Sequence, residues 1–177
     1  MLRLLRVEDR AVKVSRRLEN PATGVALINC TLNVSAQGPP LHWRVGNWKK
    51  PPIDIEIDPT DGHLSALQVV LQDEGIAEGV LWKTEMKKIS GIPFFDLAIW
   101  PPKGRYLDEH SEPVIARSPS GDLWCAFERF PSQACSECAI DHSLVVYFDS
   151  ADRLIGFGLR GVSSFESDVI RKARTTD

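Results

Sequence analysis

Apolar and polar residues alternate with a period of two along much of the chain, which is the pattern of half-buried β-strands. The clearest case begins at residue 53, where Ile53, Ile55 and Ile57 alternate with acidic residues. The turn Pro59–Gly62 contains an Asp-Gly pair, and an apolar return segment ends at Leu71. Because Asp-Gly between two apolar runs is a strong hairpin signal, we predict a β-hairpin here.

A second hairpin is predicted near the end of the chain. Leu144–Phe148 is an uninterrupted apolar run, Asp149–Asp152 is a polar turn, and Leu154–Leu159 is the return strand. A strand that is apolar on both faces belongs in the middle of a sheet, covered on both sides. Gly156 and Gly158 in the return strand leave room for a neighbouring ring or backbone to approach closely.

The remaining segments extend this β-rich pattern. Further strands are predicted at Leu2–Val7, Ala11–Leu18, Val25–Val34 and Leu41–Trp48, with a hairpin formed by Val114–Arg117 and Asp122–Phe130. Lys103–Glu112 and Pro131–Asp141 are predicted loops, whereas Val80–Ile89 fits a helix or a strand equally well. A capping box at Ser163–Glu166 predicts a helix over residues 164–174. The predicted fold is mainly β, with antiparallel hairpins in one or two sheets, as a sandwich or half-barrel, and a short C-terminal helix.

The turns of the two hairpins resemble each other. Asp58-Pro-Thr-Asp61 precedes Leu64 much as Asp149-Ser-Ala-Asp152 precedes Leu154. One interpretation is an internal duplication within a single domain of residues 1–177, with β-rich halves at 1–78 and 90–177. Two unrelated hairpins explain this short match equally well.

Size and charge narrow the class of protein. A chain of 177 residues buries enough apolar surface to fold without a disulfide or metal. The net charge of −3 argues against general binding to nucleic acids or membrane surfaces. The N-terminal segment has arginines within its short apolar run and does not fit a signal peptide. We therefore expect a cytoplasmic protein with reduced thiols.

The N-terminal segment is basic. Its cations are Arg3, Arg6, Arg10, Lys13, Arg16 and Arg17. We predict that they form a solvated outer face; a contact surface for an acidic partner is the alternative.

One cysteine pair suggests metal chemistry. Cys135 and Cys138 form a C-x-x-C, and His142 follows four residues later. Two thiolates and an imidazole are part of a tetrahedral zinc site, but the usual second ligand pair is missing from the sequence. The chain also lacks the serine-hydrolase, zinc-protease and phosphate-loop motifs. We expect no metal or other cofactor. A small metal-dependent enzyme or zinc-stabilised regulator using these three residues is the alternative.

Acidic residues gather in the middle of the chain. Residues 51–82 contain no lysine or arginine, and alternation places Asp54, Glu56 and Asp58 on one face of a strand. A row of carboxylates suits a basic partner. The alternative is a charged edge that keeps the strand soluble. The predicted partner-binding residues are Asp54, Glu56, Asp58, Asp61, Asp73 and Glu74.

The last hairpin, Tyr147–Gly156, is similar to hairpins in small bacterial β-domains. A compact, β-rich, acidic-patched chain without catalytic motifs resembles the immunity proteins of bacterial toxin systems, including those of contact-dependent growth inhibition. The resemblance implies a non-enzymatic module that binds and neutralises a cognate toxin, such as a nuclease domain. It implies no direct contact with nucleic acid or membrane. Immunity proteins have many unrelated folds, so the resemblance assigns no individual residue.

Overall fold

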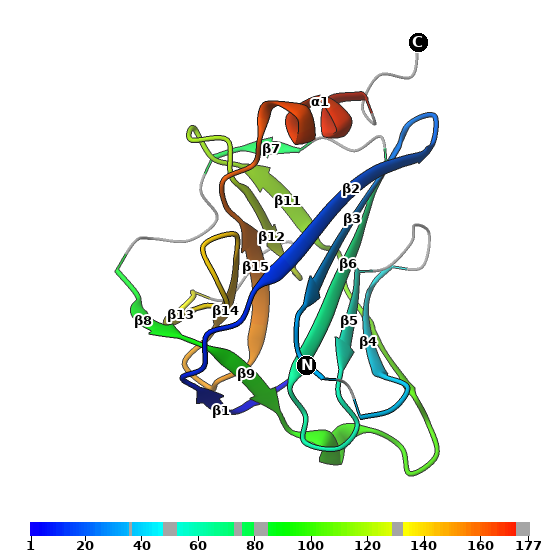
Figure 1. The fold of residues 1–177 in the computed structure, drawn as a ribbon, viewed down its shortest axis with the longest axis vertical. Helices are drawn as coiled ribbons and strands as arrows, with labels where there is room; N and C mark the ends of the chain where they lie inside the picture. The colour runs from blue at the N-terminus through cyan, green and yellow to red at the C-terminus, as the bar shows by residue number, and fades with distance from the viewer. Residues whose placement is uncertain (36, 48–52, 73–75, 80–84, 129–132, 173–177) are drawn as a thin grey trace.

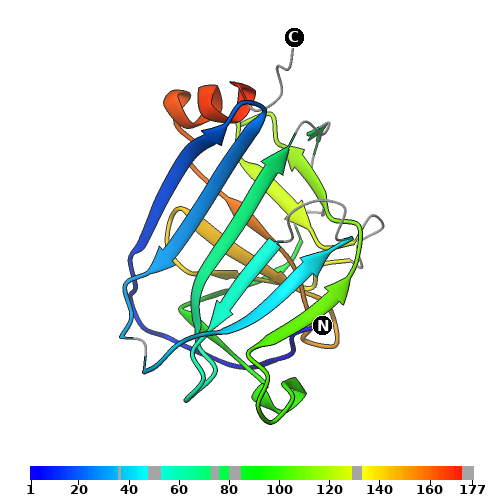
Figure 2. The ribbon, with the colours of Figure 1, turned by 90° about the vertical axis from the view of Figure 1, so that its right-hand side faces the viewer.

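The fold is mainly β, as predicted, in a computed structural model that describes residues 1–35, 37–47, 53–72, 76–79, 85–128 and 133–172. Two large, mostly antiparallel sheets face each other (Figures 1 and 2). The first contains, in spatial order, β10 (Tyr106–His110), β4 (Leu41–Gly46), β5 (Ile53–Ile57), β6 (Leu64–Gln72), β3 (Val25–Leu32) and β2 (Val14–Ala22). The second contains β7 (Ala77–Glu78), β11 (Val114–Arg117), β12 (Leu123–Ala126), β15 (Leu154–Leu159), β14 (Leu144–Phe148), β13 (Ser136–Ala139) and β8 (Lys87–Ser90).

Three shorter elements complete the fold. They are the ribbon of β1 (Leu4–Glu8) with β9 (Ile92–Phe95), the 3-10 helix η1 (Leu97–Ile99) and the helix α1 (Ser164–Lys172). The helix lies at one end of the two sheets, and the ribbon lies toward the other end (Figure 1). None of the helical segments that the structure describes has the length and apolarity needed to cross a membrane.

The two sheets repeat the same strand order. The run β2-β3-β6-β5-β4-β10 corresponds to β11-β12-β15-β14-β13-β8, with four antiparallel pairs followed by one parallel pair in each. The register shifts at equivalent places, after Glu56 in β5 and after Tyr147 in β14. This repetition is what a duplicated unit would produce, and it favours the duplication over two unrelated hairpins. The division into halves 1–78 and 90–177 stays a prediction.

The two repeats interlock. The N–H of Leu4 donates to the carbonyl of Asp152 at 2.8 Å, and the N–H of Phe95 donates to the carbonyl of Gly62 at 2.8 Å. Each ribbon strand therefore bonds to the hairpin turn of the other repeat, and Leu4 pairs with Phe95 where the strands meet. Asp152 and Gly62 both have positive φ, 57° and 85°, which turns their carbonyls toward the ribbon.

An apolar core lies between the sheets, and the central strands β14 and β15 of the second sheet are buried on both faces. All five residues of β14 are buried, which confirms that the last hairpin is central. On its outer side the rings of Trp124 and Tyr147 stack with centroids 5.4 Å apart. A Cβ at Gly158 would lie 3.1 Å from the Tyr147 hydroxyl, so the predicted close approach of a ring at this glycine is confirmed. Ile155 packs on this outer side with Tyr147.

Two predicted loops are in fact strands. Tyr106–His110, inside the predicted loop 103–112, forms β10 and pairs in parallel with β4. Ser136–Ala139, inside the predicted loop 131–141, forms β13 between β14 and β8. Both strands are short. The parallel partner of β10 lies about sixty residues earlier in the chain, so local alternation could not reveal β10. β13 forms a hairpin with the nearby β14, but its sequence Ser-Glu-Cys-Ala shows no apolar alternation.

A largely buried arginine joins the first sheet to the second sheet and to the helix. Arg16 was predicted to lie on a solvated face, but its side chain is only 11% exposed. Its guanidinium forms a bidentate pair with Glu166, at 2.6 and 2.8 Å, and donates to the carbonyls of Ser143, Arg160 and Gly161. Burial opposes the charge of Glu166, but the Arg16 pair and the Ser163 N–H hold the pKa of Glu166 below its usual value. The predicted capping box is therefore present and also holds this ion pair.

We expect Arg16→Met to lower the free energy of unfolding by ~3 kcal/mol, because it leaves a poorly hydrated carboxylate and unpaired carbonyls. Arg17→Met is the matched control, since Arg17 is the exposed neighbour on the same strand and should change stability by less than about 0.5 kcal/mol. Urea unfolding of both variants measures the difference. Equal stability of the two variants would show that the Arg16 cluster adds nothing to the fold.

Candidate functional site

The outer side of β4, β5 and β10 carries a connected set of polar and aromatic side chains. We call it the β4–β10 face, consisting of His42, Arg44, Asp54, Tyr106 and Asp108. Register brings these residues together: Tyr106 pairs with His42, Asp108 with Arg44, and Arg44 with Asp54. Their neighbours in the chain, among them Trp43 and Ile55, point inward and are buried.

Tyr106 is the centre of this face. Its side chain is 55% exposed, yet two neighbours hold it. The His42 ring stacks on it at 4.8 Å with an interplanar angle of 18°, and the Arg44 guanidinium lies 4.6 Å from the ring centroid. Arg44 is fixed in turn by a bidentate pair with Asp108, at 2.7 and 2.9 Å. An exposed aromatic ring is thus presented in one orientation.

Neighbouring basic side chains compensate much of the negative charge of the predicted acidic row. Asp54 lies 3.0 Å from Nδ1 of His42, and Arg44 is its cross-strand partner. Glu56 is half-buried opposite His42, and burial raises the pKa of its carboxyl, which nearby His42 partly offsets. Asp54 and Glu56 therefore belong to a mixed-charge surface and not to an isolated negative strip.

Asp58 does not share that face. It follows β5, its residue is 1% exposed, and its carboxylate accepts the N–H groups of Gln37 and Thr60 at 2.7 Å each. The prediction that it lies in an exposed acidic row is wrong, because the register shift and the turn after Ile57 carry the side chain inward. Burial opposes its charge, but these N–H donors hold the pKa of Asp58 below its usual value.

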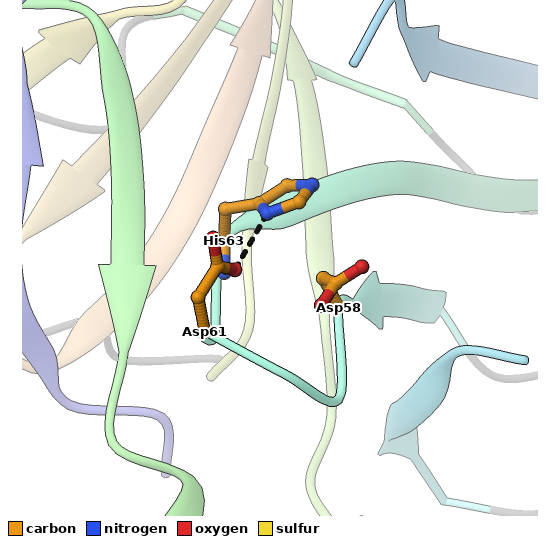
Figure 3. A group of neighbouring side chains, drawn as sticks. All are labelled: Asp58, Asp61 and His63. Atoms are coloured by element: carbon orange, nitrogen blue, oxygen red, sulfur yellow. Dashed lines mark hydrogen bonds and ion pairs between the residues drawn. The ribbon is translucent and has the colours of Figure 1, made fainter. Parts of the chain in front are cut away.

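Asp58, Asp61 and His63 cluster at this turn (Figure 3). One potential ligand atom from each lies within 4.8 Å of the others, and Nδ1 of His63 is 2.6 Å from Asp61. Carboxylates and imidazole are groups that can hold a divalent cation. Here, however, both oxygens of Asp58 accept main-chain N–H groups, and Asp61 faces His63.

Of the other predicted partner-binding residues, Asp61 is exposed, whereas Asp73 and Glu74 lie outside the described residues.

The equivalent turn of the second sheet clarifies this cluster. Asp149 is buried there, accepts the N–H groups of Ala151 and Arg153 at 2.9 Å each, and pairs with the Arg153 guanidinium. Arg153 thus occupies the position of His63. Because both repeats place a buried aspartate and a basic side chain at this point, we interpret the Asp58 cluster as a turn-stabilising device.

The three residues of the alternative zinc hypothesis are not brought together. Cys138 is buried, its thiol donates to the carbonyl of Gly91, and burial raises its pKa to about 12. Cys135 is exposed just before the same strand, and the His142 side chain is 93% exposed. Among the described residues, the group with metal-ligand spacing is Asp58, Asp61 and His63.

The sequence did not identify Arg44, Tyr106 or Asp108 as partner-binding residues. Tyr106 and Asp108 fell in the predicted loop, and their partners lie about sixty residues earlier in the chain. The one local signal is the alternation within Tyr106–His110, where residues 106, 108 and 110 are exposed and 107 and 109 are not. Five residues of this pattern, with charges on both sides, were too few to identify a strand.

The buried aspartates predict a specific sensitivity to acid. The pKa values of Asp58, Asp141 and Asp149 are lowered, so their stabilisation is complete above the unfolded pKa and is lost as pH falls below about 4. We expect Asp58→Asn to cost about 1–3 kcal/mol at pH 7, where it removes an acceptor. It should also reduce the loss of stability between pH 5 and pH 3.

Urea unfolding at several pH values tests this prediction, with Asp54→Asn as the control. Asp54 is only half-buried, and among the described residues its carboxylate pairs with the His42 ring and not with main-chain N–H groups. If both variants lose stability equally and keep the parent's pH dependence, the role given to Asp58 is wrong.

No family model matches the chain, and no curated protein matches it either.

Proposed function

We propose that this protein is a non-enzymatic binding module, and more concretely an immunity protein that binds and neutralises a cognate toxin in the cytoplasm. The observation that carries the binding role is the fixed, exposed Tyr106 between His42 and Arg44. Tyrosine and arginine dominate the residues that contribute most to protein interfaces.

Preorganisation supports this role. Ordering a mobile side chain on binding costs about 0.5–1.5 kcal/mol, and Tyr106 and Arg44 are already ordered by their neighbours. The charges of the β4–β10 face are also paired with one another, in His42–Asp54 and Arg44–Asp108. Such pairs form the polar surroundings of an aromatic anchor and require no bound ion to balance them.

The toxin-neutralising role is the concrete form of this proposal and rests on the resemblance described above. Asp54 and Asp108 of the β4–β10 face, with the neighbouring Glu56, outnumber its one guanidinium, Arg44, so the surface around the aromatic anchor is acidic on balance. Carboxylates that surround an anchor speed the encounter with a basic partner, such as a nuclease cleft, through long-range attraction. The Cys135, Cys138 and His142 alternative gains no support from their separate positions.

Co-expression with the product of the neighbouring gene tests the proposal. We expect a complex that co-purifies and that abolishes the toxicity of that product. Tyr106→Ala should weaken the complex by about 30-fold, which corresponds to 2 kcal/mol, because it removes the anchor. Leu5→Ala is the matched control, since Leu5 is a comparably exposed apolar residue on the β1 ribbon, at 59%.

Two outcomes would contradict the proposal. A neighbouring product that is neither toxic nor bound would remove the immunity role. A complex weakened equally by Leu5→Ala and Tyr106→Ala would remove the β4–β10 face as its site. Titration calorimetry distinguishes these results from a simple loss of folding, because it also reports the active fraction of each variant.

A further inference from the structure

We infer that the partner contributes an extended strand that pairs with the open edge of β10 and so extends the first sheet by one strand. This inference rests on the proposed function and deepens it: it names the kind of contact and the chemistry of the partner segment. The partner segment carries basic side chains and lies beside Tyr106.

The edges of the two sheets differ in how they are protected against added strands. β2 has Pro21 and a register shift between Glu19 and Ala22, and α1 packs against it. β7 has only two residues, and β8 carries two lysines among its four. Proline, irregularity, shortness and lysine are the usual means of blocking an edge.

The β10 edge has none of these four protections, and its one inward-pointing charge, Glu109, is bonded to the Trp43 indole and to the N-terminal ammonium. Its five residues contain no proline and no lysine, and their register with β4 is unbroken. Among the described strands, β10 pairs with β4 alone. Figure 2 shows it at the margin of the sheet. The counterpart of β10 in the second sheet is β8, so one of two equivalent edges is blocked by lysines and the other is not.

The main-chain groups at this edge alternate in direction. The carbonyl of Arg105 accepts from His42, and the N–H of Ser111 donates to Gly46, so odd-numbered residues face β4. The N–H and C=O groups of Tyr106, Asp108 and His110 consequently point to the open side. The side chains of these three residues are exposed. Among the described residues none bonds to these main-chain groups, so an added strand would meet three donor–acceptor pairs in register.

β10 is also held firmly in place. The indole N–H of Trp43 donates to Glu109 at 3.0 Å, and the Ser111 hydroxyl donates to the carbonyl of Phe127. Trp43 is fully buried, so the strand is anchored to the core between the sheets. A strand that is already ordered pays little entropy when another strand adds to it.

Charge selects the occupant. On the outward face beside this edge, the three carboxylates of Asp54, Glu56 and Asp108 outnumber the one guanidinium of Arg44, so the added strand should be basic. A second copy is disfavoured, because the antiparallel register that uses all three outward residues places Asp108 opposite the Asp108 of that copy. Like charges directly opposite each other destabilise a strand pair.

Amide hydrogen exchange measured by NMR tests the edge directly. The probe is a blocked seven-residue peptide in which lysine and threonine alternate with valine. We expect it to slow exchange at Tyr106, Asp108 and His110 by at least about tenfold. The amides of Leu107 and Glu109 are already protected by β4, and those of Lys88 and Ser90 in β8 should not change. Exchange that slows equally in β8, or not at all in β10, would overturn the inference.

Two matched comparisons keep the test independent of folding. A glutamate version of the peptide should bind at least about tenfold more weakly, and a version N-methylated at alternate residues should not bind. In the protein, His110→Pro removes an outward N–H and should abolish binding. Lys88→Pro makes the same change at the equivalent edge and should leave binding intact. Equal binding of the lysine and glutamate peptides would show that the partner strand need not be basic. A dimer of the protein that His110→Pro abolishes would show that the occupant of the β10 edge is a second copy of this chain.

The inference and the proposed function fail in different ways. If the toxin complex forms and His110→Pro binds the toxin as tightly as the parent, the strand addition is wrong while the function stands. If the lysine peptide protects β10 but no neighbouring product binds, the edge stands and the immunity role is wrong.

Discussion

The five N–H groups of one guanidinium join the first sheet to the second sheet and to the helix. Arg16 donates to Glu166 on α1 and to the carbonyls of Ser143, Arg160 and Gly161, which belong to the two ends of the last hairpin. Only an arginine fork can reach all of these acceptors, since a lysine has three donors on one atom. The cluster fixes β2 against the second sheet and the helix. The cluster lies at the β2 edge of the first sheet, and β10 forms the opposite edge.

Much of the fold followed from the sequence because its signals are local. The hairpins β5–β6, β11–β12 and β14–β15 and the capping box of α1 each lie within a short stretch of chain, where alternation and turn residues are sufficient. β10 could not be predicted because its parallel partner is distant, and β13 could not be predicted because Ser136–Ala139 shows no apolar alternation. Arg16 shows a different limit. Arg16 lies two residues from both Val14 and Leu18 and so shares their inward face. Its charge nevertheless favoured an outward position, because its five acceptors could not be seen in the sequence.

The candidate site was predicted only in part. Asp54 and Glu56 do lie on an outward face, but their cross-strand neighbours His42 and Arg44 change the surface from acidic to mixed. Asp58 turns inward because the two repeats share a turn in which a buried aspartate accepts main-chain N–H groups. Because the two sheets repeat the same strand order, their equivalent edge strands can be compared. β8 carries two lysines, whereas β10 carries Tyr106, Asp108 and His110.

Hydrogen-exchange mass spectrometry of the complex with the product of the neighbouring gene tests the central claim most directly, namely that the β4–β10 side of the first sheet binds the partner. The account predicts slower exchange in segments 41–46 and 106–110 on complex formation, with β8 and α1 unchanged. Protection confined to β8, to α1 or to the β1–β9 ribbon would contradict it.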